Sequence, residues 1–186
     1  MSISTASPTN VPVGTWRVDT LHSSVGFAVR HNLISTFRGR FEEYDASLII
    51  DATGRATLTG TVNAGSIAVK DGTLATHLTA PDFFDTERYP ELRFHSTDIR
   101  RDGEKLRVNG ELTIKGRSRQ ATVRGTITDV VEDPFGGTRI AFELETTIDR
   151  REYGLDWNMP MPRGGLYLSN DVTLTVTLEF TKADER

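Results

Sequence analysis

The residues best suited to chemistry in this sequence are its four histidines, His22, His31, His77 and His95. No two of them have the i, i+4 spacing that sets two metal ligands on one face of a helix. The chain contains no cysteine, which excludes disulfides, thiolate chemistry and cysteine-based zinc sites. Folding can still bring scattered histidines together, but their spacing predicts neither a metal site nor a cofactor.

A second arrangement with catalytic potential is His22 beside Ser23, a base next to a nucleophile. Adjacent residues rarely face each other, and no third group that would orient the histidine is evident. We therefore predict that the protein is not an enzyme. The expected role of His22 is a hydrogen bond, with Asp19 as its partner, that holds the turn of the first strand.

Arg150 belongs to a run of four charged residues, Asp149 to Glu152. One interpretation is that the run is the solvated end of a strand. The other is that Arg150 points inward and forms an ion pair with Asp85 or Asp19. Arg150, His22 and His31 are the polar candidates for the ends of the fold.

Trp157, Met159 and Met161 fall in a long connection between strands. Long connections without structure of their own are often functional, and unbranched methionine adapts to varied partners. These three residues are candidates for a lid or a membrane-docking rim. The alternative is that they fold back onto the end of the domain.

The elements that must position these residues are short segments in which apolar and polar residues alternate, as in strands with one buried face. Turn pairs such as Asp102-Gly103 predict hairpins, so we expect an antiparallel sheet. A sheet of roughly eight strands hides a single apolar face by closing into a barrel, and a two-sheet sandwich is the alternative. Between residues 37 and 51 the alternation shifts at Glu42-Glu43, which predicts a β-bulge.

The stretch from Asp71 to Pro90 breaks this alternation. Leu74, His77 and Leu78 recur at helical spacing, Asp71 can cap the first turn, and Pro81 ends the pattern. Phe83 and Phe84 follow as two adjacent aromatics that cannot both face water cheaply. We expect a short helix and an aromatic hook that close one end of the barrel, or else a helix packed across a sheet edge.

Glycines interrupt the apolar faces of four predicted strands, at Gly39, Gly60, Gly110 and Gly125. Glycine inside a strand marks a bend or a close approach, and it removes side-chain volume from a core. Either the strands bend there or the interior stays open for a ligand, and the two are compatible.

Composition and charge limit the possible partners, membrane topology and location of the protein. The net charge is −4 without a dense basic cluster, which argues against nucleic acid as a partner. No apolar run is long enough to span a bilayer. Residues 1–13 lack the features of a secretory signal and predict a disordered lead-in, with residues 14–186 as a single domain. The expected location is the cytoplasm.

An ordered set of short motifs resembles the YceI-like family over about residues 14 to 182. The set includes WRVD at residues 16–19, FAVRH at 27–31, FFDTERYP at 83–90 and GELTIKG at 110–116. The resemblance implies an all-β, antiparallel lipocalin-like barrel, and some members hold a polyisoprenoid or other fatty chain in an apolar tunnel. The residues expected to line such a tunnel are Phe27, Val29, Phe37, Phe41, Val62, Leu78, Phe83, Phe84, Phe94, Leu112, Ile127, Phe142, Leu174 and Val176.

Our leading hypothesis is therefore non-enzymatic binding, for sequestration or transport, of a long-chain isoprenoid or similar lipid. One alternative is a stress-related protein-interaction module with a filled barrel. Another is a small-molecule enzyme that acts at the barrel mouth through His22, His31 or Arg150. Transient membrane contact and a homodimer both remain open.

Overall fold

The computed structural model describes residues 10–183, and within them the protein is almost entirely β-structure. No helix in that part of the chain has the length and apolar character needed to cross a bilayer. The strands are β1 (Gly14–Val18), β2 (Ser24–His31), β3 (Ser35–Phe41), β4 (Tyr44–Ile50), β5 (Ala56–Asn63), β6 (Ile67–Ala68), β7 (Glu91–Asp102), β8 (Lys105–Ile114), β9 (Arg117–Ile127), β10 (Val131–Glu132), β11 (Thr138–Asp149) and β12 (Leu168–Lys182). The helices are η1 (Ala64–Ser66), α1 (Gly72–Thr79) and η2 (Arg150–Tyr153).

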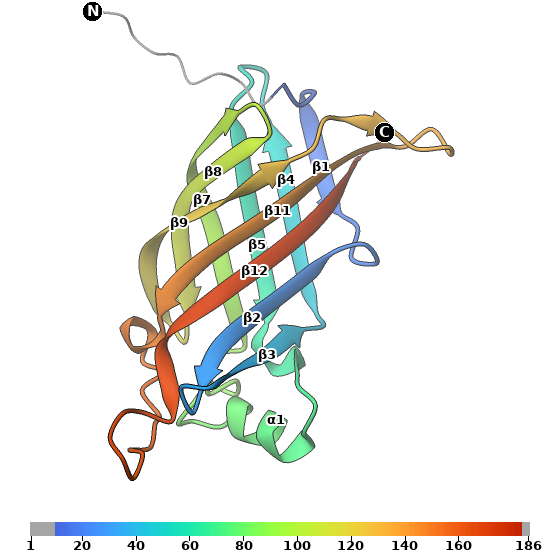
Figure 1. The fold of residues 1–186 in the computed structure, drawn as a ribbon. Helices are drawn as coiled ribbons and strands as arrows, with labels where there is room; N and C mark the ends of the chain where they lie inside the picture. Colours follow the sequence, from blue (N-terminus) through green and yellow to red (C-terminus); the bar gives the residue numbers. More distant parts are fainter. Residues whose placement is uncertain (1–9, 184–186) are drawn as a thin grey trace, which may run out of the picture.

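The strands form one closed antiparallel barrel in which consecutive segments lie side by side (Figure 1). β1 and β2 both pair with β12 and count as one kinked strand. β3 and β4 count as the second, because they pair with β2 and β1, and β5 and β6 count as the third, because they pair with β4 and β3. Counted this way, eight strands surround the interior. β12 also pairs with β11 along its length, which closes the ring. The predicted fold class is confirmed.

The predicted bulge at Glu42-Glu43 is wrong, because the strand breaks there instead. β3 ends at Phe41 and β4 begins at Tyr44. The neighbouring strand is interrupted at the same level, where Asn63 caps η1 by accepting a hydrogen bond from the Gly65 amide. The two interrupted strands remain joined by backbone hydrogen bonds from Glu42 to Ser66 (3.1 Å) and from Asn63 to Glu43 (2.9 Å). The pair therefore bends as a unit.

One end of the barrel, here called the packed end, is filled by large apolar side chains. Trp16 and Phe180 are fully buried, and Phe142 is 1% exposed. Val11 is buried in the same cluster, and the Pro12 carbonyl accepts a hydrogen bond from the Trp16 indole (3.1 Å). The predicted lead-in covers residues 1–13. From Val11 onward these residues belong to the fold, because the Val11 side chain completes the core. Residues 1–9 lie outside the described residues.

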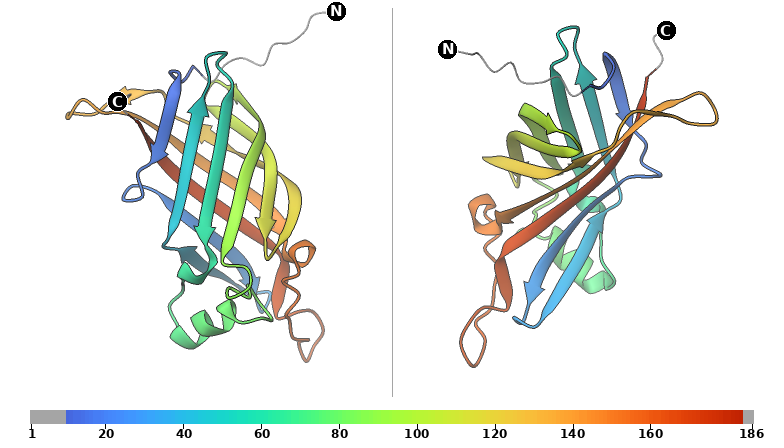
Figure 2. Two further views of the ribbon diagram at one scale, coloured as in Figure 1. Left: turned by 180° about the vertical axis from the view of Figure 1, so that it is seen from behind. Right: turned by 45° about the horizontal axis from the view of Figure 1, so that its top comes forward.

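The other end, here called the open end, carries α1 and the hook, as predicted (Figure 2). The Asp71 carboxylate accepts the Leu74 amide hydrogen (2.8 Å), and the helix ends before Pro81. The Phe84 amide then donates to the Leu78 carbonyl (3.1 Å), which turns the chain back under the helix. This turn buries Phe83 to 7% exposure.

Replacing Phe83 with alanine should lower the free energy of unfolding by about 3–5 kcal/mol, since a buried ring is lost and a cavity remains. Urea denaturation monitored by circular dichroism measures the change. Phe135→Ala is the matched control: Phe135 is 95% exposed, and its replacement should change stability by less than about 0.5 kcal/mol. Equal stabilities for the two variants would show that the hook does not hold the open end together.

Candidate functional site

The interior of the barrel is hollow toward the open end. A chamber of about 450 Å³ lies under α1 and the turn between β2 and β3. A second chamber of about 140 Å³ continues toward the middle of the barrel. The two share four wall residues, Phe41, Leu92, Ile114 and Leu174, so they adjoin inside the barrel, and they are here together called the cavity.

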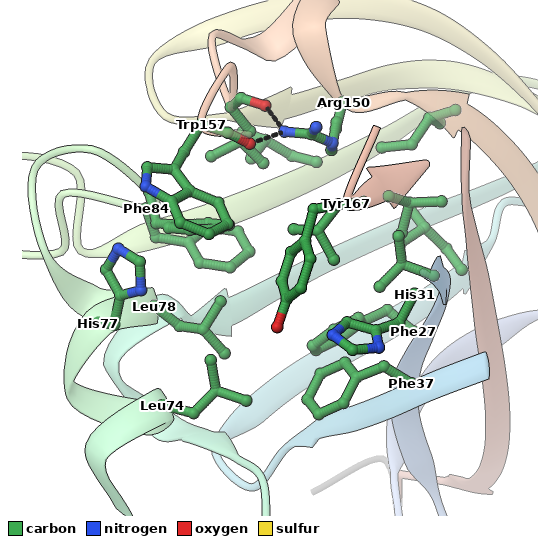
Figure 3. A pocket seen from close by; sticks show the side chains of 18 of the residues that line it. Phe27, His31, Phe37, Leu74, His77, Leu78, Phe84, Arg150, Trp157 and Tyr167 are labelled. Carbon is green, nitrogen blue, oxygen red and sulfur yellow. Dashed lines mark hydrogen bonds between the residues drawn. The ribbon is translucent and has the colours of Figure 1, made fainter. Parts of the chain in front are cut away.

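Most of the residues expected to line a tunnel do line this cavity. The larger chamber is walled by Phe27, Val29, Phe37, Phe41, Leu78, Phe83, Phe84 and Leu174 (Figure 3). The smaller one is walled by Phe41, Val62, Phe94, Leu112, Leu174 and Val176. Many of these side chains are only half-buried although they point inward, because they face empty space rather than neighbours.

Ile127 and Phe142 are placed elsewhere. Both are 1% exposed and belong to the packed end, where Phe142 lies 5.4 Å from the ring of Phe180. Ile127 ends β9 and Phe142 is near the start of β11, so both lie far from the open end. Alternation correctly placed them on the inner face, but it carries no information about the level along the barrel.

The cavity also includes wall residues that the sequence analysis did not select. Leu92, Ile114, Ile148 and Val172 continue the inner faces of their strands, so extending the alternation would have found them. Leu155, Tyr167 and Leu168 come from or adjoin the connection between η2 and β12, where no periodic signal exists.

The interior glycines do not simply leave space. A Cβ at Gly39 would lie 2.5 Å from Cζ of Phe27, and one at Gly110 would lie 2.5 Å from the His95 carbonyl oxygen. At Gly125 the neighbouring backbone comes closer still, because the Glu143 carbonyl oxygen stands almost where a Cβ would be. Only Gly60, of these four, has room, since its nearest neighbour is the Asp45 carbonyl at 3.8 Å. Close approach therefore explains three positions, and Gly60 alone faces the cavity directly.

Arg150 is 3% exposed and lines the larger chamber. Its guanidinium donates to the carbonyls of Ser169 (2.9 Å), Trp157 (2.8 Å) and Leu155, and Figure 3 shows the last two bonds. Burial lowers the pKa of Arg150, because the charged form loses hydration.

Neither interpretation of the charge run therefore holds for Arg150. It is not solvated, and backbone carbonyls occupy its donors instead of Asp85 or Asp19. Its neighbour Arg151 is exposed and pairs with Asp149 at 2.6 Å. The chain turns inward at Arg150 because η2 begins there, capped by Asp149.

The connection bound by Arg150, residues 154–167, is here called the mouth loop. Trp157 folds back onto the barrel end, with its ring 5.0 Å from that of His77 and 5.4 Å from that of Phe83. Met159 is 47% exposed and borders the chamber. Met161 lies in a tight turn, where its amide donates to the Gly165 carbonyl (3.1 Å), and it does not line the cavity.

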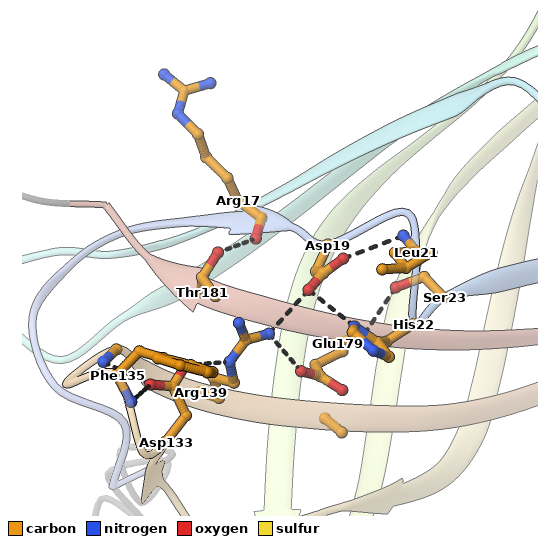
Figure 4. A network of polar contacts seen from close by, with 12 residues as sticks. Arg17, Asp19, Leu21, His22, Ser23, Asp133, Phe135, Arg139, Glu179 and Thr181 are labelled. Carbon is orange, nitrogen blue, oxygen red and sulfur yellow. Dashed lines mark hydrogen bonds and ion pairs between the residues drawn. The ribbon is translucent and has the colours of Figure 1, made fainter.

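The histidines do not converge. His31 and His77 border the larger chamber, where His31 lies 4.4 Å from the ring of Tyr167. His95 is exposed on β7. His22 binds Asp19 at 3.0 Å, as predicted, within a polar network away from the cavity (Figure 4).

That network is centred on Arg139, which donates to Asp19 (2.8 Å), Asp133 (2.6 Å) and Glu179 (2.6 Å). Asp19, His22 and Glu179 place ligand atoms within 4.8 Å of one another, the one such group among the described residues. Arg139 already supplies the positive charge between the two carboxylates. The Ser23 hydroxyl accepts the Glu179 amide hydrogen (2.9 Å), so it serves the strand pairing rather than a nucleophile's role.

The profile of the YceI-like domain matches residues 16–180. The UPF0312 protein SAB2563 of Staphylococcus aureus (strain bovine RF122 / ET3-1) is 30% identical over 166 residues, covering 88% of this chain and 95% of that protein. The structure of Burkholderia cenocepacia BcnA has a TM-score of 0.73 at 22% identity and covers 87% of this chain and 98% of its own. A polyisoprenoid binding domain from Saccharophagus degradans has a TM-score of 0.67 at 14% identity, with 90% and 98% covered. These two structures share the fold.

Arg150→Met should loosen the mouth loop. Carbonyls left without a buried donor cost about 1–3 kcal/mol each, so we expect stability to fall by about 3 kcal/mol. Amide hydrogen exchange should accelerate in residues 154–167. The matched control is Arg151→Met, which removes an exposed ion pair and should cost at most about 1 kcal/mol without changing exchange in the loop. Unchanged exchange in Arg150→Met would contradict the role of Arg150 as the tether.

Stability at low pH should depend on Asp19. Hydrogen bonds from Arg139 and then His22 lower the pKa of its carboxyl from 3.8 to about 2. A carboxyl with a depressed pKa stabilises the fold above its unfolded pKa and loses that contribution as the pH falls. The stability difference between the protein and Asp19→Asn should therefore be full above pH 3.8 and shrink toward pH 2. Urea unfolding at a series of pH values tests this, and a constant difference would count against it.

Proposed function

The chain belongs to the YceI-like family, as its motifs predicted, and from that membership and the shape of its cavity we propose that it binds a long-chain isoprenoid or similar lipid without catalysis. The observation that carries the proposal is the pair of adjoining apolar chambers, of about 450 and 140 Å³. Ligand pockets commonly measure about 300–1,000 Å³ and are mostly apolar. The polyisoprenoid binding domain among the structural neighbours supports the same class of ligand.

The distribution of polar groups favours a chain over a compact molecule. The surface of the smaller, deeper chamber is almost entirely apolar, with Leu58, Phe94 and Val123 in its wall, although Asp45 and Arg93 also border it. His31, Arg150 and Tyr167 all border the larger chamber, nearer the open end. A lipid would place its apolar chain inward and any polar group beside these residues. Burial of such a chain is worth roughly 0.8 kcal/mol per methylene, which provides affinity without a catalytic group.

The alternative functions receive less support. A filled barrel does not agree with the hollow half of the interior. An enzyme at the mouth would need a nucleophile and a base in contact, but Arg150 binds backbone carbonyls and His31 contacts the edge of an aromatic ring. His22 lies in the Arg139 network.

Native mass spectrometry of the purified protein, followed by organic extraction, tests the proposal. A bound hydrocarbon-chain lipid, or a one-to-one complex with an added polyprenol, is the expected result. A protein that carries no lipid and binds neither polyprenol nor fatty acid would refute it.

Gly60→Val should reduce lipid binding while the fold survives. The glycine faces the smaller chamber with open space around it, so the valine methyl groups would occupy the volume meant for the chain. Isothermal titration with a polyprenol and thermal melting on the same variant provide the two measurements. The control is Thr57→Val on the same strand, which borders neither chamber and should change neither measurement.

The contrasting variant is Gly110→Val, which meets the His95 carbonyl and the Phe94 ring. It should destabilise the fold by about 1–3 kcal/mol or more through overpacking. A stable Gly60→Val variant with normal binding would show that the smaller chamber does not hold the ligand.

A further inference from the structure

Exposed apolar side chains gather around the mouth of the larger chamber. Ile34 is 82% exposed, Leu33 56%, Met159 47% and Leu166 40%. We call these four residues the mouth patch. The first two form the turn between β2 and β3, and the others belong to the mouth loop.

The two segments are joined into one surface. The Asn32 amide donates to the Tyr167 carbonyl (2.8 Å), and Leu33 lies against Gly165. The turn itself is held in an unusual shape, since Asn32 and Leu33 both have left-handed backbones, with φ of 52° and 63°. Arg30 fixes it further by donating to the Leu33 carbonyl (2.7 Å). Leu33 and Ile34 are thus presented to solvent by a fixed backbone.

Positive charge predominates around the patch. Residues 30–38 include Arg30 and Arg38 and no aspartate or glutamate, and the mouth loop contains Arg163 and one carboxylate, Asp156. This contrasts with the net charge of −4 for the whole chain. On the helix side of the mouth, Asp71 caps α1 and Asp82 binds His77 at 2.9 Å, so both carboxylates are engaged.

The opposite end of the molecule offers a direct contrast. Phe135 is 95% exposed and Val131 56%, both near the β10–β11 turn. The segment 126–138 around them contains Asp129, Glu132 and Asp133 and no lysine or arginine, although Arg101 pairs with Asp129 (2.7 Å) and Arg139 with Asp133 (2.6 Å). An anionic surface would therefore attract the mouth more strongly than this end.

We propose that the mouth patch docks on an anionic lipid bilayer, with the Leu33-Ile34 turn and the mouth loop in contact with the membrane. Apolar tips enter the boundary between headgroups and acyl chains, while the neighbouring arginines bind anionic headgroups. This adds a partner surface to the proposed binding of a lipid chain. A mouth seated on the bilayer lets a chain move between membrane and cavity without crossing water.

Sedimentation with vesicles tests the docking without any ligand in the cavity. Vesicles of phosphatidylglycerol and phosphatidylcholine in equal parts should bind the protein, and vesicles of phosphatidylcholine alone should bind it much more weakly. Ile34→Ser should weaken binding to the mixed vesicles about tenfold, because one fully inserted side chain is lost. Arg163→Gln should weaken it about fivefold and reduce its salt dependence.

The matched control is Phe135→Ser, which removes the most exposed ring from the acidic end and should leave vesicle binding unchanged. Thermal melting of each variant confirms that it is folded. Three results would overturn the proposal: no binding to mixed vesicles, equal binding to both kinds of vesicle, or an equal loss in Phe135→Ser and Ile34→Ser. A dimer in analytical ultracentrifugation that Ile34→Ser dissociates would also overturn it, since the patch would then join two copies of the chain. Vesicle binding by a protein that takes up neither polyprenol nor fatty acid would leave the docking intact and refute only the binding proposal.

Discussion

The whole structure depends on the double pairing of β12. This strand bonds to β11 on one side and to β1 and β2 on the other, so a sheet with one apolar face closes into a ring. Closure turns the apolar face into an interior. Each long strand of the ring has a partner on both sides over at least part of its length, and β9 pairs with β11 only through residues 124–127, so little strand edge is left exposed. The cavity and its mouth exist only because this ring closes.

The interior glycines help to keep the cavity open by an indirect route. The ring of Phe27 lies over Gly39, and the ring of Phe94 lies over Gly110, each where a Cβ would otherwise stand. The aromatic side chains are thereby seated against the wall of the barrel instead of across its centre. At the packed end, by contrast, Trp16, Phe142 and Phe180 fill the section completely. The same kind of residue thus closes one half of the barrel and lines the other.

Arg150 connects the cavity with its mouth. It is a charged group in an apolar wall, and such burial is tolerated because backbone carbonyls satisfy its donors. Those carbonyls belong to the mouth loop or its junction with β12, so one side chain fixes the position of Trp157 and the exposure of Met159. The loop contains no helix or long strand, and its shape depends on this tether, on the contacts of Trp157 with the aromatic hook, and on the two hydrogen bonds between the Asn158 side chain and the Leu168 backbone.

The sequence by itself determined the features that local physics controls. Alternation specified the strands and their inner faces, Asp71 and Pro81 bounded the helix, and the proximity of Asp19 to His22 in the chain predicted their bond. Only the tertiary structure decided at which level along the barrel each inner residue lies. Ile127 and Phe142 share their pattern with Phe94 and Leu112, yet the first two are packed and the others line a cavity. Whether a level is filled depends on the summed volume of side chains from all the strands that meet there, and no single strand encodes that sum.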